Sequence, residues 1–370
     1  MEKKVIVISA VNLVEGGPLT ILQKCLAALS EFDNDQYLVV AIVHDKELAN
    51  FSNVEYIELK WPKKNWLLRV FYEYIYSYKL SLNIKPYLWF SLHDVTSCVK
   101  SNRRVVYCHN AMPFYHSKIK DVANCYKEVL FSYLYKYLYR INIKKNLFIV
   151  VQQNWIKDAF IEMFSLNEDK VIVAKPTEKL EDIPKINNVP NENEKIFFYP
   201  AFPRTFKNFE VICEACEILC SNGLKNFQIV LTLDGSENHY SHSIYMKYSN
   251  LDMIRFVGLL SKEKVAEMYA LADCLIFPSK LETWGLPISE FSIYHKPMII
   301  SNLPYAHETA MGASIVSFFD PDCPTDLAKR MREVIESQYS TFIDVPIQEE
   351  DRQTVYSWHK LFDKILNEEA

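Results

Sequence analysis

The sequence predicts an α/β protein made of two doubly wound parallel-sheet domains. At 370 residues the chain is longer than one ordinary domain. Short continuous apolar runs alternate with helix-like segments along both halves, which is typical of parallel strands that helices cover on both faces. Residues 177–195 interrupt this alternation with Pro, Asn, Lys and Glu, as a linker does. We therefore expect a first domain over 1–176, a second over 177–353 and a C-terminal helix over 354–370.

In the first half, continuous apolar runs predict the strands, and longer segments with apolar residues at helical spacing predict the helices. The expected strands are 4–9, 37–44, 54–59, 87–92, 104–109, 147–151 and 170–174. The expected helices are 18–32, 66–82, 126–141 and one that begins at Gln153.

The second half repeats the scheme. Its expected strands are 196–200, 227–233, 253–258, 273–279 and 296–301. Its expected helices are 209–220, 262–272, one that begins near Pro287, one that ends near Ile335, and a last amphipathic segment over 354–369.

The composition is that of a globular protein from a reducing compartment. Apolar residues make up 49% of the chain and charged residues 24%. No apolar stretch approaches the roughly 20 residues that span a bilayer, and the N-terminal run lacks the features of a signal peptide. The nine cysteines are scattered, which predicts reduced thiols and a cytoplasmic location. Cys213, Cys216 and Cys220 share one face of an expected helix, so core packing explains them better than zinc or redox chemistry.

Charge is distributed unevenly along the chain. Residues 1–176 hold 23 Lys and Arg against 17 Asp and Glu, whereas residues 177–370 hold 18 against 29, which gives the net charge of −5. A basic half on an acidic protein predicts that this half meets an anionic surface or ligand. Nucleic acid is not expected as that partner, because the sequence has no helix-turn-helix, RNP or zinc-finger signature.

Two acids flank a Gly-x-Pro turn in the segment PSKLETWGLPISE, residues 278–290. Because proline is tolerated only in the first turn of a helix, Glu282 should lie on a loop and Glu290 in the first turn of a helix. The unpaired N–H groups at such a helix start suit a phosphate, and the acid one turn in suits a neutral polyol such as a ribose. The alternative is an acidic helix start that only complements the helix dipole.

Glu282 and Glu290 form a Glu-x7-Glu pattern with Gly-Leu-Pro between them and KPMIISNLPYAHE after them. In this context, residues 256–308 resemble family 4 of the retaining glycosyltransferases, which have the GT-B fold of two Rossmann-like domains facing a cleft. VVYCHNAMPF and YPAFPRTFKNFE look like further segments of the family, so the resemblance covers nearly the whole chain. It implies that the first domain binds the acceptor, that the second binds the donor, and that the last helix crosses back onto the first.

The resemblance also implies roles in donor binding. Glu290 would bind the ribose of the nucleotide, and Glu282 would bind a hydroxyl of the donor sugar and act on the charge that develops at the anomeric carbon. The backbone N–H groups that would line the sugar and the distal phosphate belong to Thr283, Trp284, Gly285 and Leu286. Trp284 stands where the family more often has phenylalanine.

Two cations, Arg204 and Lys207, lie in the segment PRTFKNFE between an expected strand and an expected helix. A diphosphate leaving group gains negative charge as the glycosidic bond breaks, so fixed cations stabilise the transition state without a metal. The resemblance places both beside the pyrophosphate, with Lys207 in a catalytic role. Only two residues separate them, fewer than in many members of the family, so the alternative for Arg204 is a solvated loop cation.

Three features of the first half are further site candidates. Gly16 and Gly17 precede a helix-starting proline, in a loop where backbone can approach a phosphate or sugar; an ordinary tight turn is the alternative. His109 ends an expected strand, and the resemblance gives it a catalytic place beside the donor sugar or acceptor; the alternative is a structural histidine. His93 and Asp94 end another expected strand and are candidates for the acceptor side.

The expected helix over 66–82 interleaves aromatic and basic residues. They are Trp66, Phe71, Tyr72, Tyr74, Tyr76 and Tyr78, with Lys63, Lys64, Arg69 and Lys79. Aromatic rings with cations suit a membrane surface that contains anionic lipids, and such a contact would explain the basic first half. The alternative is that the aromatic side chains form core, as residues at helical spacing usually do.

The resemblance thus implies an enzyme that moves a sugar from a UDP- or GDP-sugar to a hydroxyl of a glycan or polyprenyl-linked glycan, with retained configuration. We expect it to need no metal or other cofactor, and to act in bacterial O-antigen or capsule synthesis on the inner face of the membrane. One alternative is a sugar-nucleotide epimerase of GT-B fold, which would convert the donor without an acceptor. Another is a non-catalytic subunit that binds a nucleotide or a partner; the presence of Glu282, Glu290 and Lys207 argues against it.

Overall fold

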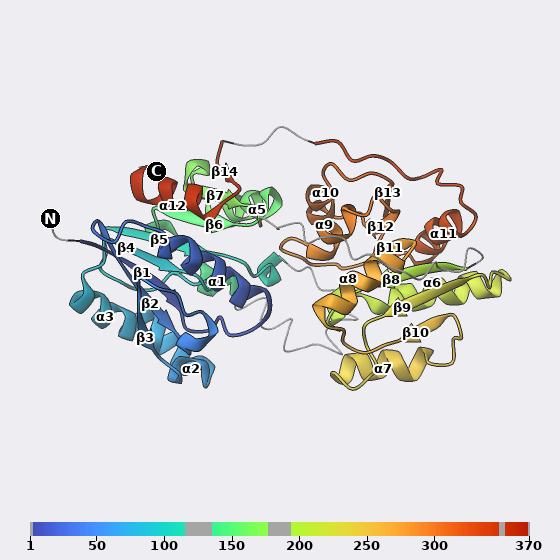
Figure 1. Ribbon diagram of the computed structural model, residues 1–370, viewed down its shortest axis with the longest axis horizontal. Helices are drawn as coiled ribbons and strands as arrows, with labels where there is room; N and C mark the ends of the chain where they lie inside the picture. The colour runs from blue at the N-terminus through green and yellow to red at the C-terminus, as the bar shows by residue number, and fades with distance from the viewer. Residues whose placement is uncertain (1–2, 115–134, 177–193, 348–351, 369–370) are drawn as a thin grey trace. The chain divides into compact units, whose positions relative to one another are not determined.

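The structure, a computed structural model, describes residues 3–114, 135–176, 194–347 and 352–368. These residues form two compact units, each built on one parallel sheet with helices packed on it (Figure 1). The second unit consists of 194–347, and the first contains the other three described ranges. The expected α/β class is confirmed.

The sheet of the first unit has eight parallel strands in the spatial order β14-β7-β6-β5-β4-β1-β2-β3. They are β1 (Lys4–Ala10), β2 (Tyr37–Val43), β3 (Val54–Glu58), β4 (Leu88–Ser91), β5 (Arg103–Tyr107), β6 (Phe148–Val151), β7 (Val171–Ala174) and β14 (Thr354–Val355). All seven expected strands are present, whereas β14 is too short to show a pattern in the sequence. The strand order reverses between the neighbours β1 and β4.

The sheet of the second unit has six parallel strands in the order β10-β9-β8-β11-β12-β13. They are β8 (Lys195–Tyr199), β9 (Phe227–Leu231), β10 (Ile254–Phe256), β11 (Cys274–Phe277), β12 (Met298–Ser301) and β13 (Val316–Phe319). The five expected strands are confirmed, and β13 is an additional edge strand. The order reverses here between β8 and β11.

The helices of the first unit follow the expected pattern. They are α1 (Gly16–Ser30), α2 (Trp66–Phe71), α3 (Ser77–Ile84), α5 (Asn154–Phe164), α12 (Trp358–Asn367) and a helix at 135–140. A π-helical turn, η3 (Tyr72–Tyr76), joins α2 to α3, so that 66–84 is one continuous helix. Most of the expected linker over 177–195 and the first part of the expected helix over 126–141 lie outside the described residues.

The helices of the second unit include two that the sequence did not predict, α7 (His239–Tyr248) and α10 (Pro304–Thr309). The others are α6 (Phe209–Ser221), α8 (Lys262–Leu271), α9 (Leu286–Ser292) and α11 (Pro324–Ile335). Helix α7 is mostly polar, so it shows no apolar periodicity; a capping box between Asn238 and Ser241 starts it. Cys213 and Cys216 lie on the buried face of α6. Short 3₁₀ turns occur at η1 (Lys46–Leu48), η2 (Trp61–Lys63), η4 (Met112–Phe114), η5 (Ile143–Lys145), η6 (Glu168–Lys170) and η7 (Thr205–Lys207).

The continuous helix 66–84 has a buried face and an exposed face. Tyr72 is fully buried beside Trp89, and its hydroxyl lies 2.7 Å from that of Ser9. The exposed apolar side chains of the helix are Trp66, Leu67, Phe71, Ile75, Tyr78 and Leu82. The aromatic residues are therefore divided between core and surface. Among the described residues, no helix combines the length and the apolar character needed to cross a bilayer.

Helix α12 packs on the first unit although it follows the second unit in the chain. Its buried side chains Leu361, Phe362 and Ile365 join the core formed with α1 and the central strands. Arg103 of β5 donates from Nη1 to the carbonyl of Ile365 at 2.9 Å and to that of Glu368 at 2.6 Å. These bonds satisfy carbonyl groups that the end of a helix leaves without a partner.

We expect Phe362→Ala to lower the free energy of unfolding of the first unit by about 3–5 kcal/mol. The ring is fully buried and meets the rings of Phe32 and Phe90 edge to face, so truncation leaves a cavity. Asp363→Ala, at the next and exposed position, is the matched control, with a change below about 0.5 kcal/mol. Urea unfolding monitored by tryptophan fluorescence measures both, and equal midpoints would contradict the role of α12.

Candidate functional site

Two loops of the second unit meet where its strand order reverses. Strands β8 and β11 are neighbours there, and the chain leaves them toward opposite sides of the sheet. In open parallel sheets, ligands bind at this point, beyond the carboxyl ends of the strands. The loop after β8 contains Arg204 and Lys207, and the loop after β11 contains Glu282.

Hydrogen bonds hold these two loops together. The Lys280 N–H donates to the carbonyl of Phe206 at 2.7 Å. Asn208, which is buried, donates from Nδ2 to the carbonyls of Pro278 at 3.2 Å and Pro321 at 2.8 Å. Its φ of +58° is in the left-handed region, which asparagine adopts more readily than most residues. The loops are therefore fixed relative to each other.

Lys207 and Glu282 form an ion pair at the meeting of the loops. Lys207 Nζ donates to Glu282 Oε1, and it also lies 5.7 Å from the centre of the Phe277 ring. The two side chains are 18% and 14% exposed, so the pair is only partly solvated. The site thus presents a fixed cation, which can bind an anionic group, beside a carboxylate, which can accept hydrogen bonds from hydroxyl groups.

Two buried tyrosines support these loops. The Tyr199 hydroxyl donates to the carbonyl of Lys207 at 2.9 Å, and the Tyr305 hydroxyl donates to the carbonyl of Ser279 at 2.7 Å. Burial raises the pKa of both hydroxyls well above the usual range, and the negative charge of Glu282 raises them further. Both therefore stay protonated at neutral pH and remain hydrogen-bond donors.

The turn before α9 depends on Gly285. Its φ is +88°, and a Cβ there would lie 3.4 Å from the Tyr305 ring, so another residue would be strained and crowded. The helix begins at Leu286, as expected. The indole N–H of Trp284 donates to Ser289 Oγ at 2.8 Å, which turns this side chain back onto α9.

Glu290 lies farther along α9 than expected. Counted from Leu286, the acid is the fifth residue of the helix and falls outside the first turn. The prediction that Glu290 lies in the first turn was therefore wrong. The alternative, an acid that only complements the helix dipole, also loses its basis, because the dipole acts on charges only within the first turn. Tyr269 of α8, which is buried, donates its hydroxyl to Glu290 Oε2 at 2.7 Å and fixes the carboxylate.

Three expected donor-site residues lie at the rim of this site. Arg204 is exposed, and its guanidinium lies 5.4 Å from the centre of the Phe202 ring. Thr283 is half-buried on the loop after β11, and Leu286 is 40% exposed at the start of α9. Arg204 and Leu286 are therefore more exposed than Lys207 and Glu282.

In the first unit, Asp94 organises the ends of β4 and β5. Its Oδ1 accepts hydrogen bonds from the backbone N–H groups of His109 and Asn110, at 2.7 and 3.0 Å, and from the Tyr139 hydroxyl at 3.0 Å. His109 Nε2 lies 3.5 Å from Asp94 Oδ2. His109 does not end its strand: β5 stops at Tyr107, because Asp94 captures the backbone N–H of His109.

His93 lies inside the first unit rather than on its surface. Its Nε2 is 3.0 Å from Ser9 Oγ, and its Nδ1 is 3.3 Å from Glu73 Oε1. Burial lowers the pKa of His93 well below the usual range, and the positive charge of Arg69 lowers it further. The imidazole is therefore neutral at physiological pH and belongs to a buried network behind Glu73.

Gly16 and Gly17 form the first turn of α1 rather than a loop before it. The expectation of a loop was wrong because the helix begins two residues before the proline. Gly16 has a φ of +61°, which favours glycine. A Cβ built at either position meets no atom within 4 Å, so both backbones are open to solvent.

Sequence reasoning missed several residues that shape these sites. Asn208 ends the 3₁₀ turn η7, and asparagine is one of the few residues that commonly end a helical turn in the left-handed conformation. Glu73 also had a signal, because it is the only acid between residues 60 and 85 and stands four positions after Arg69. Tyr269 had none, because the spacing of 21 residues to Glu290 corresponds to no local pattern.

Known proteins resemble the chain over most of its length. Residues 180–351 match the family described as glycosyl transferases group 1. The O-antigen chain mannosyltransferase RfbU of Salmonella typhimurium strain LT2 is 21% identical over 316 residues, which is 81% of each chain. The structure of the lipopolysaccharide outer core galactosyltransferase WaaB matches with a TM-score of 0.62 at 12% identity, over 98% of this chain and 99% of WaaB. HepE of Anabaena in complex with UDP-glucose matches with a TM-score of 0.58 at 12% identity, over 91% of each chain.

The two units have the GT-B fold of these glycosyltransferase structures. The family match covers the second unit, where Lys207, Glu282 and Glu290 lie around one strand reversal. The fold, the family match over residues 180–351 and the O-antigen relative agree that this chain is a glycosyltransferase, whose second unit resembles the group 1 family.

Proposed function

We propose that this enzyme transfers a hexose from a nucleotide diphosphate sugar to a hydroxyl of a bacterial surface glycan or its lipid-linked precursor. The observation that carries the proposal is the Lys207–Glu282 pair at the strand reversal of the second sheet. RfbU, an O-antigen chain mannosyltransferase, supports the glycan acceptor. HepE, whose structure contains UDP-glucose, supports the nucleotide-sugar donor.

In this proposal the leaving diphosphate binds at Lys207. The ammonium group is partly desolvated and held by Glu282 and the Phe277 ring, so its charge needs little reorganisation when the glycosidic bond breaks. Charge on the departing oxygen grows in the transition state, which is why a fixed cation there accelerates the reaction. We propose that this cation, with Arg204 at the rim, replaces a metal.

The two acids divide the recognition of the donor in this proposal. Glu290, fixed by Tyr269, accepts hydrogen bonds from the ribose hydroxyls. Glu282 accepts a hydrogen bond from a hydroxyl of the donor sugar. The acceptor hydroxyl attacks the anomeric carbon from the side on which the diphosphate leaves and passes its proton to the departing diphosphate oxygen, so the configuration is retained. His109, held by Asp94, contacts the reacting sugars.

We expect one nucleoside diphosphate among UDP, GDP, ADP and CDP to stabilise the wild-type protein in the presence of EDTA. Ligand at about 100 times its dissociation constant adds roughly 2.7 kcal/mol of stability. Glu290→Ala should abolish this shift, because the ribose loses its acceptor. Glu267→Ala, which removes an exposed acid from α8, is the control and should keep it. A thermal-shift titration measures all three proteins, and an unchanged shift in Glu290→Ala would refute the ribose role.

We expect Lys207→Ala to lower kcat for sugar transfer by about 10²–10³-fold, the usual effect of removing one group that stabilises transition-state charge. Lys280→Ala is the control, because this neighbouring lysine pairs with Asp322 at 3.0 Å instead of with Glu282. Release of nucleoside diphosphate with a glycan acceptor present measures the rate. A donor that is converted to its epimer without any acceptor would show that the enzyme is an epimerase instead.

We also propose that the helix 66–84 rests on an anionic membrane surface. Its exposed apolar residues Leu67, Phe71, Ile75, Tyr78 and Leu82 recur every three or four positions and so share one face. The only acid between residues 60 and 85, Glu73, is buried.

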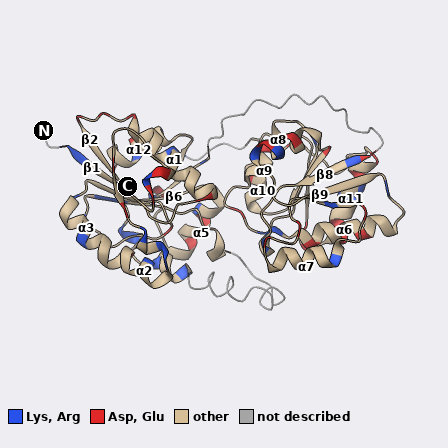
Figure 2. Cartoon of the chain, turned by 60° about the horizontal axis from the view of Figure 1, so that its bottom comes forward, with Lys and Arg blue, Asp and Glu red and all other residues tan. Residues whose placement is uncertain are grey.

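The exposed charges along this helix are therefore all positive. They belong to Lys63, Lys64, Lys79 and Lys85, and Figure 2 shows basic residues along α2 and α3. A lipid surface with negative headgroups complements both features, at about 1 kcal/mol for each lysine near it.

We expect the protein to float with vesicles that contain phosphatidylglycerol, and to be released from them at high salt. The double variant Leu67→Glu, Ile75→Glu should lose this binding, because both side chains are exposed on the apolar face. Met246→Glu changes an equally exposed apolar residue on α7 of the second unit and is the control. Vesicle flotation measures binding, and retention of the double variant on the vesicles would exclude this surface.

A further inference from the structure

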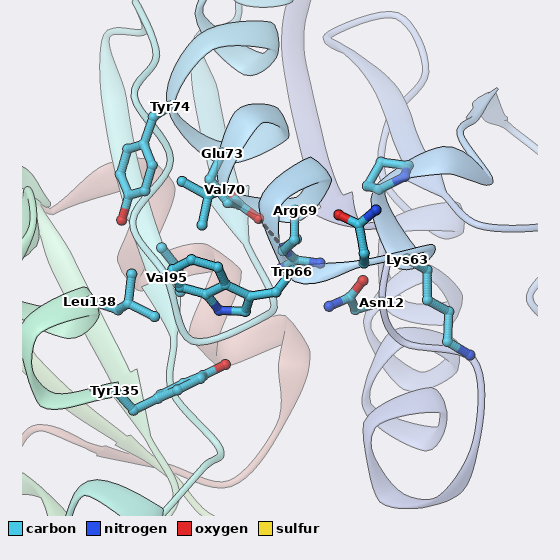
Figure 3. Close-up of a pocket in the computed structure, with 12 residues that line it drawn as sticks. Asn12, Lys63, Trp66, Arg69, Val70, Glu73, Tyr74, Val95, Tyr135 and Leu138 are labelled. Carbon is cyan, nitrogen blue, oxygen red and sulfur yellow. Dashed lines mark ion pairs between the residues drawn. The ribbon is translucent and has the colours of Figure 1, made fainter. Parts of the chain in front are cut away.

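A pocket of about 260 Å³ opens in the first unit beside the helix 66–84 (Figure 3). It lies where the first sheet reverses its strand order. Asn12 in its wall follows β1, and Val95 follows β4, and these strands are the neighbours at the reversal. The pocket therefore occupies the position at which open parallel sheets bind ligands. None of the donor-site residues of the second unit contributes to it.

One wall of the pocket is polar and almost without net charge. Arg69 Nε lies 2.7 Å from Glu73 Oε1, and the Ser97 hydroxyl donates to Glu73 Oε2 at 2.6 Å. Figure 3 shows this ion pair at the edge of the pocket. Within the described part of the chain, Arg69 Nη1 and the Tyr74 hydroxyl are buried without a hydrogen-bond partner. Arg69 and Tyr74 both line the pocket, so each brings unused hydrogen-bonding capacity to its wall.

The other walls are aromatic and aliphatic. Figure 3 shows Trp66 between two sets of side chains, with Tyr135 and Leu138 to one side in the view and Asn12 and Lys63 to the other. The indole of Trp66 is about half exposed, so one ring face can be covered by a ligand. Aromatic faces bury much apolar area in a defined geometry.

These features together fit a neutral sugar ring. A pyranose has apolar C–H faces, which aromatic rings can cover, and hydroxyl groups at its edge, which amides, carboxylates and guanidinium groups bind. A phosphate fits less well, because the charge of Arg69 is already balanced by Glu73. The volume is below the roughly 300–1,000 Å³ of pockets for drug-sized molecules, so it suits one ring rather than a chain of them.

We propose that this pocket binds the terminal sugar of the acceptor, stacked on Trp66 with its hydroxyls bonded to Asn12, Arg69 and Glu73. This inference rests on the proposed function, because it supplies the acceptor for that transfer. The same helix presents a second, apolar face to solvent. A glycan attached to a lipid can therefore place its sugar in the pocket while its lipid stays in the membrane.

The test is binding of free glycosides, which needs neither donor nor transfer. Saturation-transfer NMR with methyl glycosides of mannose, glucose, galactose and N-acetylglucosamine should show millimolar binding of at least one. Trp66→Ala should weaken this binding at least tenfold, and Glu73→Gln, which keeps the shape of the side chain, should weaken it too. Tyr137→Ala is the matched control, because it removes an equally exposed aromatic ring on 135–140 that lies outside the pocket.

Three outcomes would overturn the proposal. The first is that none of the four glycosides binds, and the second is that wild type and Trp66→Ala bind equally well. The third is that Glu282→Gln loses the binding, because that would place the sugar in the donor site. If instead the proposed sugar transfer were wrong, nucleotides would give no thermal shift and no diphosphate would be released. Neither result would change the glycoside binding, which is measured without a donor. With an active enzyme, Trp66→Ala should raise KM for the acceptor and leave the nucleotide shift unchanged.

Discussion

The reversal of strand order inside each sheet is the constraint on which the functional architecture depends. The chain leaves β1 and β4, and likewise β8 and β11, toward opposite faces of their sheets, so the space beyond their carboxyl ends is not covered by a crossover helix. Polar loops can converge there without interrupting the buried sheet. Lys207 and Glu282 converge at one reversal, and Asn12 and the Arg69–Glu73 pair lie at the other.

Both places pair a cation with a carboxylate, but the pairs differ in burial. The Lys207–Glu282 pair is partly solvated, so an incoming anion can take over the ammonium group at small cost. The Arg69–Glu73 pair is almost fully buried, and removal of either partner would leave an unpaired charge in the interior. The first pair suits a ligand whose charge changes during a reaction. The second suits a neutral ligand that the pair only has to orient.

The π-helical turn η3 explains how one helix can serve a core, a pocket and a surface. An extra residue in the turn shifts the side-chain positions, and Tyr72 and Glu73 both point inward as a result. Tyr72 then joins the core beside Trp89, while Glu73 reaches Ser97 and His93. Phe71 and Ile75 on either side stay exposed. π-turns inside α-helices are frequent at functional sites, which agrees with the placement of the pocket here.

Much of the fold could be predicted from local pattern alone. All twelve strands expected from continuous apolar runs are present, because a strand covered by helices on both faces must be apolar throughout. The missed elements, β13, β14, α7 and α10, are short or polar and owe their existence to neighbours rather than to their own sequence.

The candidate site was predictable only in part. The Glu-x7-Glu spacing around Gly285 determined that Glu282 lies on a loop and that a helix follows, since proline and a left-handed glycine leave few alternatives. The contacts of Glu290 with Tyr269, of His109 with Asp94 and of Glu73 with His93 join residues that are distant in the chain or carry no local signal. Local sequence determines backbone conformation through sterics and burial, whereas the partners of a side chain depend on which strands become neighbours. Only the tertiary structure decided that.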